Sequence, residues 1–426
     1  MLLKIRKKSI AEWLVLFVLV MPFAFFFFID LMGLGSIIKY TIDIAWLLLL
    51  VIIARSRSRA ADSETPKLAW IASVFFLLTV VGLILHFQSP LYYLWGLRNN
   101  VRFFVFFFSC IIFLDRRYIA DYMKIFDVIF WINVPIVFYQ YFVLGLSQDY
   151  LGGIFGTEKG CNAYTTIFFS IIIAKSLLMF LNYREKKSLC ILKCVIVLLI
   201  SAITELKFFF VLFAVIVVIA FAMTRLTLRK VGIAVLSVVG VYVAISVLVA
   251  VFPEYADWFS LENMLETVTT DKGYTLSGDM NRLTTFSIAL EKFLTTLPDK
   301  LFGLGLGNCD YSSSFDFLTS PFYRNFGHLN YTWFSSAYLI LETGIIGTVV
   351  YFSFFVVLFF SISKKQKSMT GDDAIYCNLT KIMAVIAVMM VIYNASMRME
   401  AGYMIYFTLA LPFIGDGADK KQNKVV

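Results

Sequence analysis

The chain has 426 residues, of which 60% are hydrophobic and only 15% are charged, and its formal net charge is +9. Soluble domains are about half apolar and about a quarter charged, so this composition excludes a water-soluble globular enzyme. The excess apolar surface must face lipid. Because every backbone amide in hydrocarbon must bond within its own segment, we expect an all-α, polytopic integral membrane protein.

Long apolar runs predict about twelve membrane-spanning helices. In chain order they cover residues 11–28, 36–54, 67–87, 103–114, 122–144, 163–181, 188–204, 208–224, 231–252, 332–359, 378–396 and 400–414. We expect the short fourth run to extend back through residues 97–102. The start of the chain resembles a signal peptide, but no small-residue cleavage site follows it, so we expect an uncleaved anchor.

Lysines and arginines gather in every second loop, which predicts that both termini are cytoplasmic. This pattern accounts for the positive charge without nucleic acid, and we expect no nucleic-acid partner. The chain then divides into nine helices at 1–252, one large extracytoplasmic loop at 253–331, and three helices with a cytoplasmic tail at 332–426. Acidic residues outnumber basic ones in the loop by ten to five, so its cations are not part of the orientation signal.

The loop carries two local patterns. Apolar residues from Leu283 to Leu297 recur at helical spacing. They predict an amphipathic helix over the membrane domain, with Asp279 as candidate N-cap, Arg282 in its first turn and Pro298 at its end. The glycine-rich run LFGLGLGN at 301–308 then predicts a tight turn. It matches neither the GxGxxG nor the Walker pattern, so it is only weak evidence for a phosphate-binding loop.

His328, one of only two histidines, lies where the loop re-enters the membrane, near Tyr323, Arg324 and Asn330. Imidazole titrates near neutral pH and can accept a proton from a hydroxyl. We therefore predict a catalytic or substrate-binding role for His328, the alternative being a structural loop histidine. The other histidine, His86, is interpreted as an interfacial packing residue.

Several cations lie on the outer side, against the orientation rule, and we predict that they bind an anionic headgroup such as a diphosphate. They are Arg98, Arg102, Lys159, Lys207, Arg282, Arg324 and Arg398. The alternative is pairing with Glu158, Glu205 or Glu400, or with lipid phosphate.

Three further features concern charges within the helices and two thiols that the topology places outside the membrane. Glu342 falls well inside the tenth span and needs a partner or a wet cavity. Lys39 and Asp43 are four residues apart, which predicts an intrahelical ion pair. Cys161 and Cys309 could form a disulfide if the outer compartment is oxidising. No cysteine spacing indicates a zinc or haem site.

These residues together resemble the Wzy-type O-antigen and capsular polysaccharide polymerases, and more broadly the superfamily they share with the O-antigen ligase WaaL. The similar segments are DYLGGIFGTEKGCNAY at 149–164, SAITELKFFF at 201–210, Arg282 with LFGLGLGN, and GHLNYTWFSSAYLILETGIIG at 327–347. Here one residue separates the histidine from the asparagine of the family's usual pair.

The resemblance implies a metal-independent glycosyltransferase without cofactor in the bacterial cytoplasmic membrane, with its active site on the extracytoplasmic side. A glycan on polyprenyl diphosphate would be transferred to a lipid-linked repeat unit, with a chain-length regulator as a further partner. His328 and Arg282 would be catalytic. The other outer cations, Tyr323 and Asn330 would bind substrate.

Three other functions remain open from the sequence. An O-antigen ligase-type transferase would share the fold and mechanism. A lipid-linked oligosaccharide flippase or transporter would be expected to show internal repeats, and no convincing repeat relates the two halves. A structural envelope protein is the third.

Overall fold

The computed structural model describes residues 9–55, 63–86, 89–224, 280, 282 and 284–415, together with Gly232, Val239, Gly240, Tyr242, Ser246 and Val249. The expected helix at 231–252 and the expected N-cap Asp279 therefore lie largely outside the described residues. The described part of the chain consists of helices and connecting loops, without a β-strand.

The α-helices follow one another along nearly the whole chain. Their bounds are α1 Ile10–Val20, α2 Tyr40–Arg55, α3 Thr65–His86, α4 Pro90–Phe113, α5 Ile119–Phe142, α6 Asn162–Leu181, α7 Lys187–Ile203, α8 Lys207–Ala222, α11 Thr285–Ile288, α12 Leu297–Phe302, α13 Pro321–Phe326, α14 Ser335–Lys365, α15 Gly371–Tyr393 and α16 Gly402–Ala410. Short 3-10 turns join several of them, including Ser36–Lys39 before α2 and Ser396–Arg398 before α16.

Within the described residues, seven helices are long and apolar enough to cross a membrane. They contain α2, α3, α4, α5, α6, α14 and α15. This confirms a helical membrane protein, while the expected count of about twelve stays a prediction. Three expected spans are short apolar helices instead, at Ile10–Ala24, Lys207–Ala222 and Gly402–Phe413. In the first, α1 gives way to a 3-10 turn, Met21–Ala24, because Pro22 in that turn has no N–H to continue the hydrogen-bond ladder of the preceding helix.

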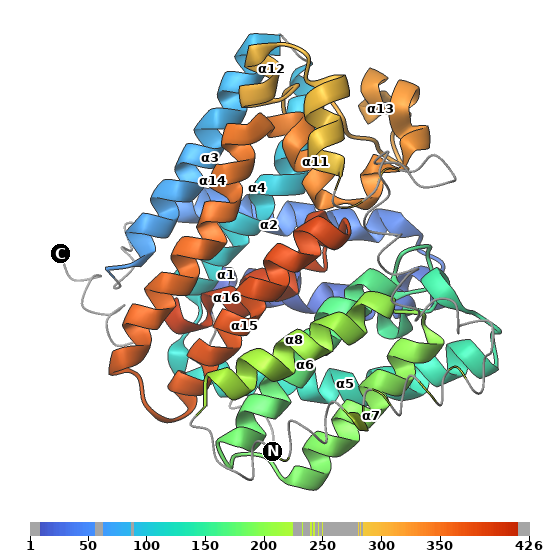
Figure 1. The fold of residues 1–426 in the computed structure, drawn as a ribbon, viewed down its shortest axis with the longest axis vertical. Coiled ribbons are helices and arrows are strands. Elements are labelled where there is room, and N and C mark those ends of the chain that lie inside the picture. Colours follow the sequence, from blue (N-terminus) through green and yellow to red (C-terminus); the bar gives the residue numbers. More distant parts are fainter. Residues whose placement is uncertain are drawn as a thin grey trace.

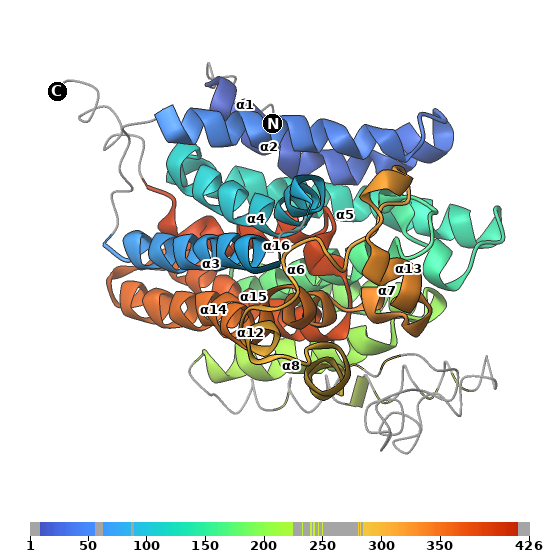
Figure 2. The same cartoon turned by 90° about the horizontal axis from the view of Figure 1, so that it is seen from above.

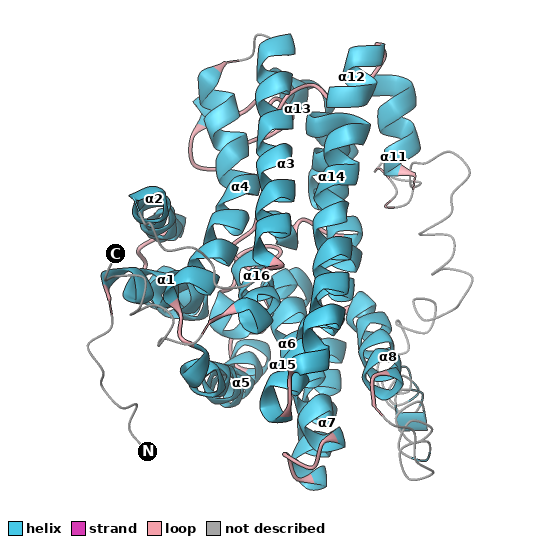
Figure 3. Cartoon of the chain, turned by 90° about the vertical axis from the view of Figure 1, so that its left-hand side faces the viewer, coloured by secondary structure: helices cyan, strands magenta, loops and turns pink. Residues whose placement is uncertain are grey.

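The helix α14 packs against both α3 and α15. Figures 1 and 2 show α12 and α11 over the first turns of α14, with α13 beside them. Figure 3 shows α3, α4 and α14 standing side by side, whereas α1 and α2 are seen nearly end-on. Interlocking rings of Phe104, Phe354 and Tyr406 fill the space between α4, α14 and α16.

A glycine-rich turn after α12 packs directly on a kink in α14. Gly344 adopts φ +62°, which interrupts the helix. The amides of Leu304 and Gly305 donate hydrogen bonds to the Leu341 and Glu342 carbonyls at 2.7 and 3.2 Å. Since these amides are already bonded to protein, the turn LFGLGLGN supports the start of α14 and is not arranged as a phosphate cradle.

Replacing Gly344 by alanine is expected to destabilise the protein. A Cβ at this position would lie 2.5 Å from the carbonyl of Leu301 and the amide of Gly303, and both are backbone atoms that cannot move aside cheaply. The positive φ adds strain of about 1–3 kcal/mol. The free energy of unfolding in detergent should fall by at least that amount, whereas Gly35→Ala, also at positive φ but with nothing near it, should cost only the strain. Equal losses for the two variants would contradict the packing described here.

The expected amphipathic helix of the loop is shorter than the pattern suggests. After α11 the chain continues as a π-helical turn, Ala289–Phe293, and leaves helical geometry at Leu294. Pro298 does not end this helix but lies in the first turn of α12, which Thr296 caps, because proline fits the first turn of a helix, where no N–H partner is lost. The buried Ile288 and Leu294 pack into the cluster formed by the start of α14.

Candidate functional site

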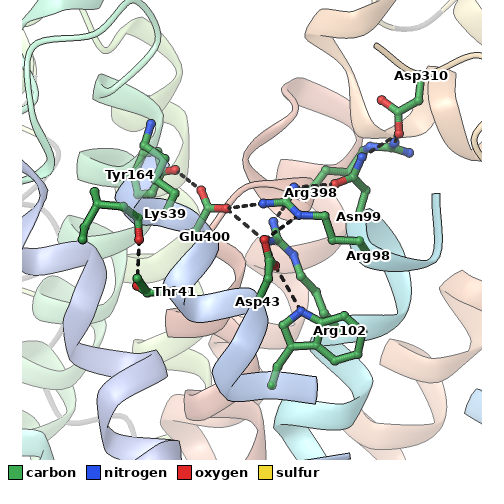
Figure 4. A network of polar contacts seen from close by, with 12 residues as sticks. Lys39, Thr41, Asp43, Arg98, Asn99, Arg102, Tyr164, Asp310, Arg398 and Glu400 are labelled. Carbon is green, nitrogen blue, oxygen red and sulfur yellow. Dashed lines mark hydrogen bonds and ion pairs between the residues drawn. The ribbon is translucent and has the colours of Figure 1, made fainter. Parts of the chain in front are cut away.

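Three of the predicted outer cations, Arg98, Arg102 and Arg398, meet in one buried group of charges. Figure 4 shows side chains from α2, α4, α6, the loop after α12 and the α15–α16 connection converging there. We call this group the arginine network. It comprises Asp43, Arg98, Asn99, Arg102, Tyr164, Asp310, Glu342, Arg398 and Glu400.

One half of the network surrounds Glu400. The Arg102 guanidinium, which is fully buried, places Nη1 3.0 Å from Glu400 Oε1. The Tyr164 hydroxyl donates to Glu400 Oε2 at 2.7 Å. Arg98 Nε lies 2.8 Å from Asp43 Oδ2, so Asp43 ties α2 to α4.

The other half surrounds Arg398. Its Nη2 lies 2.5 Å from Asp310 Oδ2 and its Nη1 lies 3.3 Å from Glu342 Oε2, while the guanidinium stacks 3.7 Å from the Tyr338 ring centroid. Asn99 joins the two halves, accepting from Arg98 at 2.8 Å and donating to Asp310 at 2.6 Å. Glu342 thus has the partner that its position in α14 requires.

The charges of this network control the ionisation of Glu400, which lies in the connection between α15 and α16. Burial alone would raise the pKa of Glu400, but the charges of Arg102, Arg98 and Lys39 and the hydrogen bond from Tyr164 lower it to about 2. Glu400 is therefore a carboxylate at physiological pH, and Arg102 has a full countercharge.

The network answers two predictions about these cations. Each of the three arginines, Arg98, Arg102 and Arg398, forms ion pairs with carboxylates, and Glu400 is one of them. The structure therefore agrees better with the alternative of pairing than with an open site for a lipid headgroup. The expected Lys39–Asp43 pair is wrong: Lys39 Nζ lies 2.5 Å from Glu158 Oε2. The reason is that Lys39 ends a 3-10 turn before α2 begins, which breaks the α-helical spacing between the two residues.

Arg282 lies elsewhere, in an aromatic setting. Its Nε donates to the Tyr393 carbonyl at 3.1 Å, and its Cζ lies 4.6 Å from the Tyr393 ring and 5.2 Å from the Phe334 ring. Among the described residues, no carboxylate forms an ion pair with Arg282. An arginine held through Nε and its ring contacts can present its outer nitrogens to an anion.

Lys207 belongs to the same place, which we call the Arg282 site: Arg282, Lys207, Phe208, Phe334 and Tyr393. The ring of Phe208 stacks on that of Tyr393 with centroids 3.8 Å apart. Lys207 precedes Phe208 and is near enough to Arg282 for their positive charges to interact. Asp149 and Glu205 also act on Lys207 electrostatically. The residues of the site come from four segments that are remote in sequence.

His328 approaches this site through the backbone. The Met280 amide donates to the Leu329 carbonyl at 2.9 Å, which ties the residue after His328 to a residue two positions before Arg282. His328 itself lies in a 3-10 turn, Gly327–Leu329, with its side chain exposed. An exposed imidazole is accessible to a bulky substrate.

The remaining candidates are spread over several loops and short helices. Lys159 is exposed, Arg324 pairs with the exposed Asp316 at 2.9 Å, and Tyr323 stacks on Tyr311 with centroids 4.5 Å apart. Asn330 takes a left-handed conformation, φ +56°, between two 3-10 turns. These four side chains do not join the arginine network.

Two other expectations concern His86 and the thiols. His86 Nε2 lies 3.7 Å from Asp299 Oδ1, so this histidine meets the acidic first turn of α12 rather than only packing. Cys161 and Cys309 are both buried and both free, with no disulfide between them.

Sequence patterns did not predict that Asp43, Asp310 and Tyr164 belong to the arginine network. A signal existed for Asp43, because a carboxylate in an apolar helix needs a partner, but the nearer Lys39 offered a simpler one. Nothing in the local sequence of Asp310 or Tyr164 indicates contact with residues more than 80 positions away.

No protein-family model matches the chain, and no curated protein is similar to it.

Proposed function

We propose that the chain is a polysaccharide repeat-unit polymerase of the Wzy kind, acting at the outer face of the bacterial cytoplasmic membrane. One observation carries the proposal: Arg282 has aromatic and carbonyl contacts but no carboxylate partner among the described residues, and Lys207 lies beside it. An arginine that no described carboxylate neutralises, in a site that also holds a lysine, suits a diphosphate, whose oxygens accept charge-assisted hydrogen bonds.

The convergence of separate motifs supports the same proposal. The segments that resemble polymerases contribute Asp149, Lys207 and Arg282 to one place, and the Met280–Leu329 hydrogen bond brings the His328 turn towards it. Folding thus assembles residues that the sequence keeps far apart.

The proposed reaction transfers the glycan from its carrier to a new repeat unit. A hydroxyl oxygen of the acceptor forms a bond to the anomeric carbon of the donor glycan, and the bond from that carbon to the diphosphate oxygen breaks. The hydroxyl proton passes to His328, and polyprenyl diphosphate leaves with the electron pair. Arg282 and Lys207 stabilise the negative charge that grows on the leaving group.

Replacing His328 by alanine is expected to slow polymer formation by about 10²–10⁴-fold, the usual contribution of a general base. Because the His328 side chain is exposed, we expect the variant to fold normally, and its level in the membrane should match that of the parent protein. Polymer formed from a lipid-linked repeat by purified protein measures the rate, and added imidazole should restore part of it. An unchanged rate would remove His328 from the mechanism.

A ligase that transfers finished glycan remains the nearest alternative within the same chemistry. In cells lacking the protein, loss of long polymer with single repeats still attached supports the polymerase. Finished polymer left on its lipid carrier supports the ligase.

The arginine network favours a second candidate, a lipid-linked oligosaccharide flippase. Buried ionisable residues within membrane helices often line a transport pathway, and Arg102 and Glu342 are such residues. Movement of a fluorescent lipid-linked oligosaccharide across proteoliposome membranes, without new glycosidic bonds, would support transport over transfer.

A further inference from the structure

A compact loop between Asp310 and Ser320 displays aromatic rings on the outer surface. The Ser320 amide donates to the Asp310 carbonyl at 3.0 Å and closes the loop. Inside it, the Ser312 hydroxyl oxygen accepts from the amides of Ser314 and Phe315 at 3.3 and 3.1 Å. Such closed loops hold their shape through their own bonds and are frequently functional.

The rings continue onto neighbouring helices. Phe315 lies 5.5 Å from Tyr40 of α2 and 5.7 Å from Phe317, measured between ring centroids. Trp95 of α4 donates from Nε1 to the Tyr311 carbonyl at 3.1 Å. We call this surface the aromatic face; its members are Tyr40, Trp95, Tyr311, Phe315, Phe317 and Tyr323.

Two members of the aromatic face are strongly exposed among charges. Phe317 is 62% exposed and Tyr311 38%, and the Asp316 and Arg324 side chains between them are 86% and 56% exposed. A carboxylate this exposed is costly against hydrocarbon, so lipid chains are not the occupant that this surface suits. Exposed apolar area rimmed by polar groups marks a binding site instead.

Through α13 the aromatic face is linked to the helical segment that follows Arg282. Tyr323 of α13 stacks on Tyr311, while its neighbour Phe322 contacts Phe293, at the end of the helical segment that follows Arg282, with centroids 5.4 Å apart. The same helix leads directly into the His328 turn. A substrate held by its diphosphate at Arg282 would extend its glycan past His328 towards these rings.

We propose that the aromatic face binds the oligosaccharide part of the substrate, an inference that rests on the proposed function. A sugar ring has an apolar face of C–H groups, which packs on aromatic rings, and an edge of hydroxyls. The Asp316 carboxylate can accept hydrogen bonds from such hydroxyls, and the Arg324 guanidinium can donate hydrogen bonds to them. The rings thus hold the glycan by shape, and the charged rim fixes its orientation.

The test uses purified full-length protein in lipid nanodiscs and a soluble probe that lacks the carrier. The probe is the reducing oligosaccharide released by mild acid from the lipid-linked repeats of the cell. Its affinity is measured by saturation-transfer NMR and calorimetry for the parent protein, Phe317→Ala, Asp316→Asn and Phe142→Ala. Phe142 on α5 is 73% exposed and serves as the matched control.

Phe317→Ala should weaken binding of the probe by about tenfold, Asp316→Asn by a smaller factor, and Phe142→Ala should leave it unchanged. Unaltered affinity in Phe317→Ala, equal losses in Phe317→Ala and Phe142→Ala, or capture of a partner protein in place of the sugar would overturn the proposal. Polymer formation is measured separately. A chain that polymerises normally but binds the probe independently of Phe317 refutes this inference alone, whereas Phe317-dependent binding without any polymerisation refutes only the enzymatic function.

Discussion

Replacing Arg282 by alanine is expected to reduce polymer formation by about 10²–10³-fold, the usual loss when one preorganised donor is removed from a site of developing charge. The guanidinium is held by the Tyr393 carbonyl and two rings, so its orientation is fixed by the protein before an anion binds. Polymer length and amount on gels, normalised to membrane levels of the protein, measure the effect.

Two further variants separate this role from simple charge loss. Arg282→Lys keeps the charge but loses the planar fork and the Nε hydrogen bond, so it should restore only part of the activity. Arg184→Ala removes an exposed arginine that pairs with Asp372 and should behave as the parent protein. Normal polymer from Arg282→Ala, or an equal loss from Arg184→Ala, would contradict a specific role for Arg282.

Replacing Glu400 by glutamine is expected to lower the free energy of unfolding by about 3 kcal/mol, the lower end of the range for breaking a buried ion pair. Arg102 would stay buried without its nearest countercharge, and Asp43, at 3.4 Å from Arg102 Nη1, would compensate only in part. Denaturant titration in detergent measures the change. For the same reason Arg102→Ala is expected to lose polymer by unfolding, not by losing a substrate contact.

The pH dependence of stability provides a second readout for Glu400. Burial raises its pKa and the surrounding cations lower it, with a net fall from 4.5 to about 2. A lowered pKa contributes stability that is present above pH 4.5 and is lost as the pH falls from about 4.5 towards 2. Glu400→Gln should lack this part of the acid destabilisation, and Glu291→Gln, at an exposed carboxylate, should retain it. Identical acid profiles for all three proteins would show that the buried pair contributes nothing.

Helices were the predictable part of the fold, because their signal is local. The apolar run at 163–181 becomes α6, Asn162–Leu181, almost residue for residue. The run at 103–114 proved to be the end of α4, which begins at Pro90, since polar residues such as Asn99 and Arg102 interrupt the hydropathy while serving the buried network. Hydropathy cannot distinguish a polar residue that ends a helix from one that the fold buries with partners.

The candidate site was predictable in its residue types but not in its pairing. Three of the cations that we predict on the outer side pair within the arginine network, and their partners come from elements far away in the chain, such as Asp310 for Arg398. Arg282 differs from the paired arginines only through its surroundings in three dimensions. Sequence spacing gives no measure of which guanidinium will be neutralised by a carboxylate.

Reconstitution of the purified protein with a single lipid-linked repeat unit tests the central claim, that the Arg282 site binds the leaving diphosphate, most directly. The account predicts polymer of increasing length, one polyprenyl diphosphate released for each new linkage, and loss of both in Arg282→Ala but not in Arg184→Ala. Lipid-linked repeats that move between leaflets or remain single, with no polyprenyl diphosphate released, would contradict it.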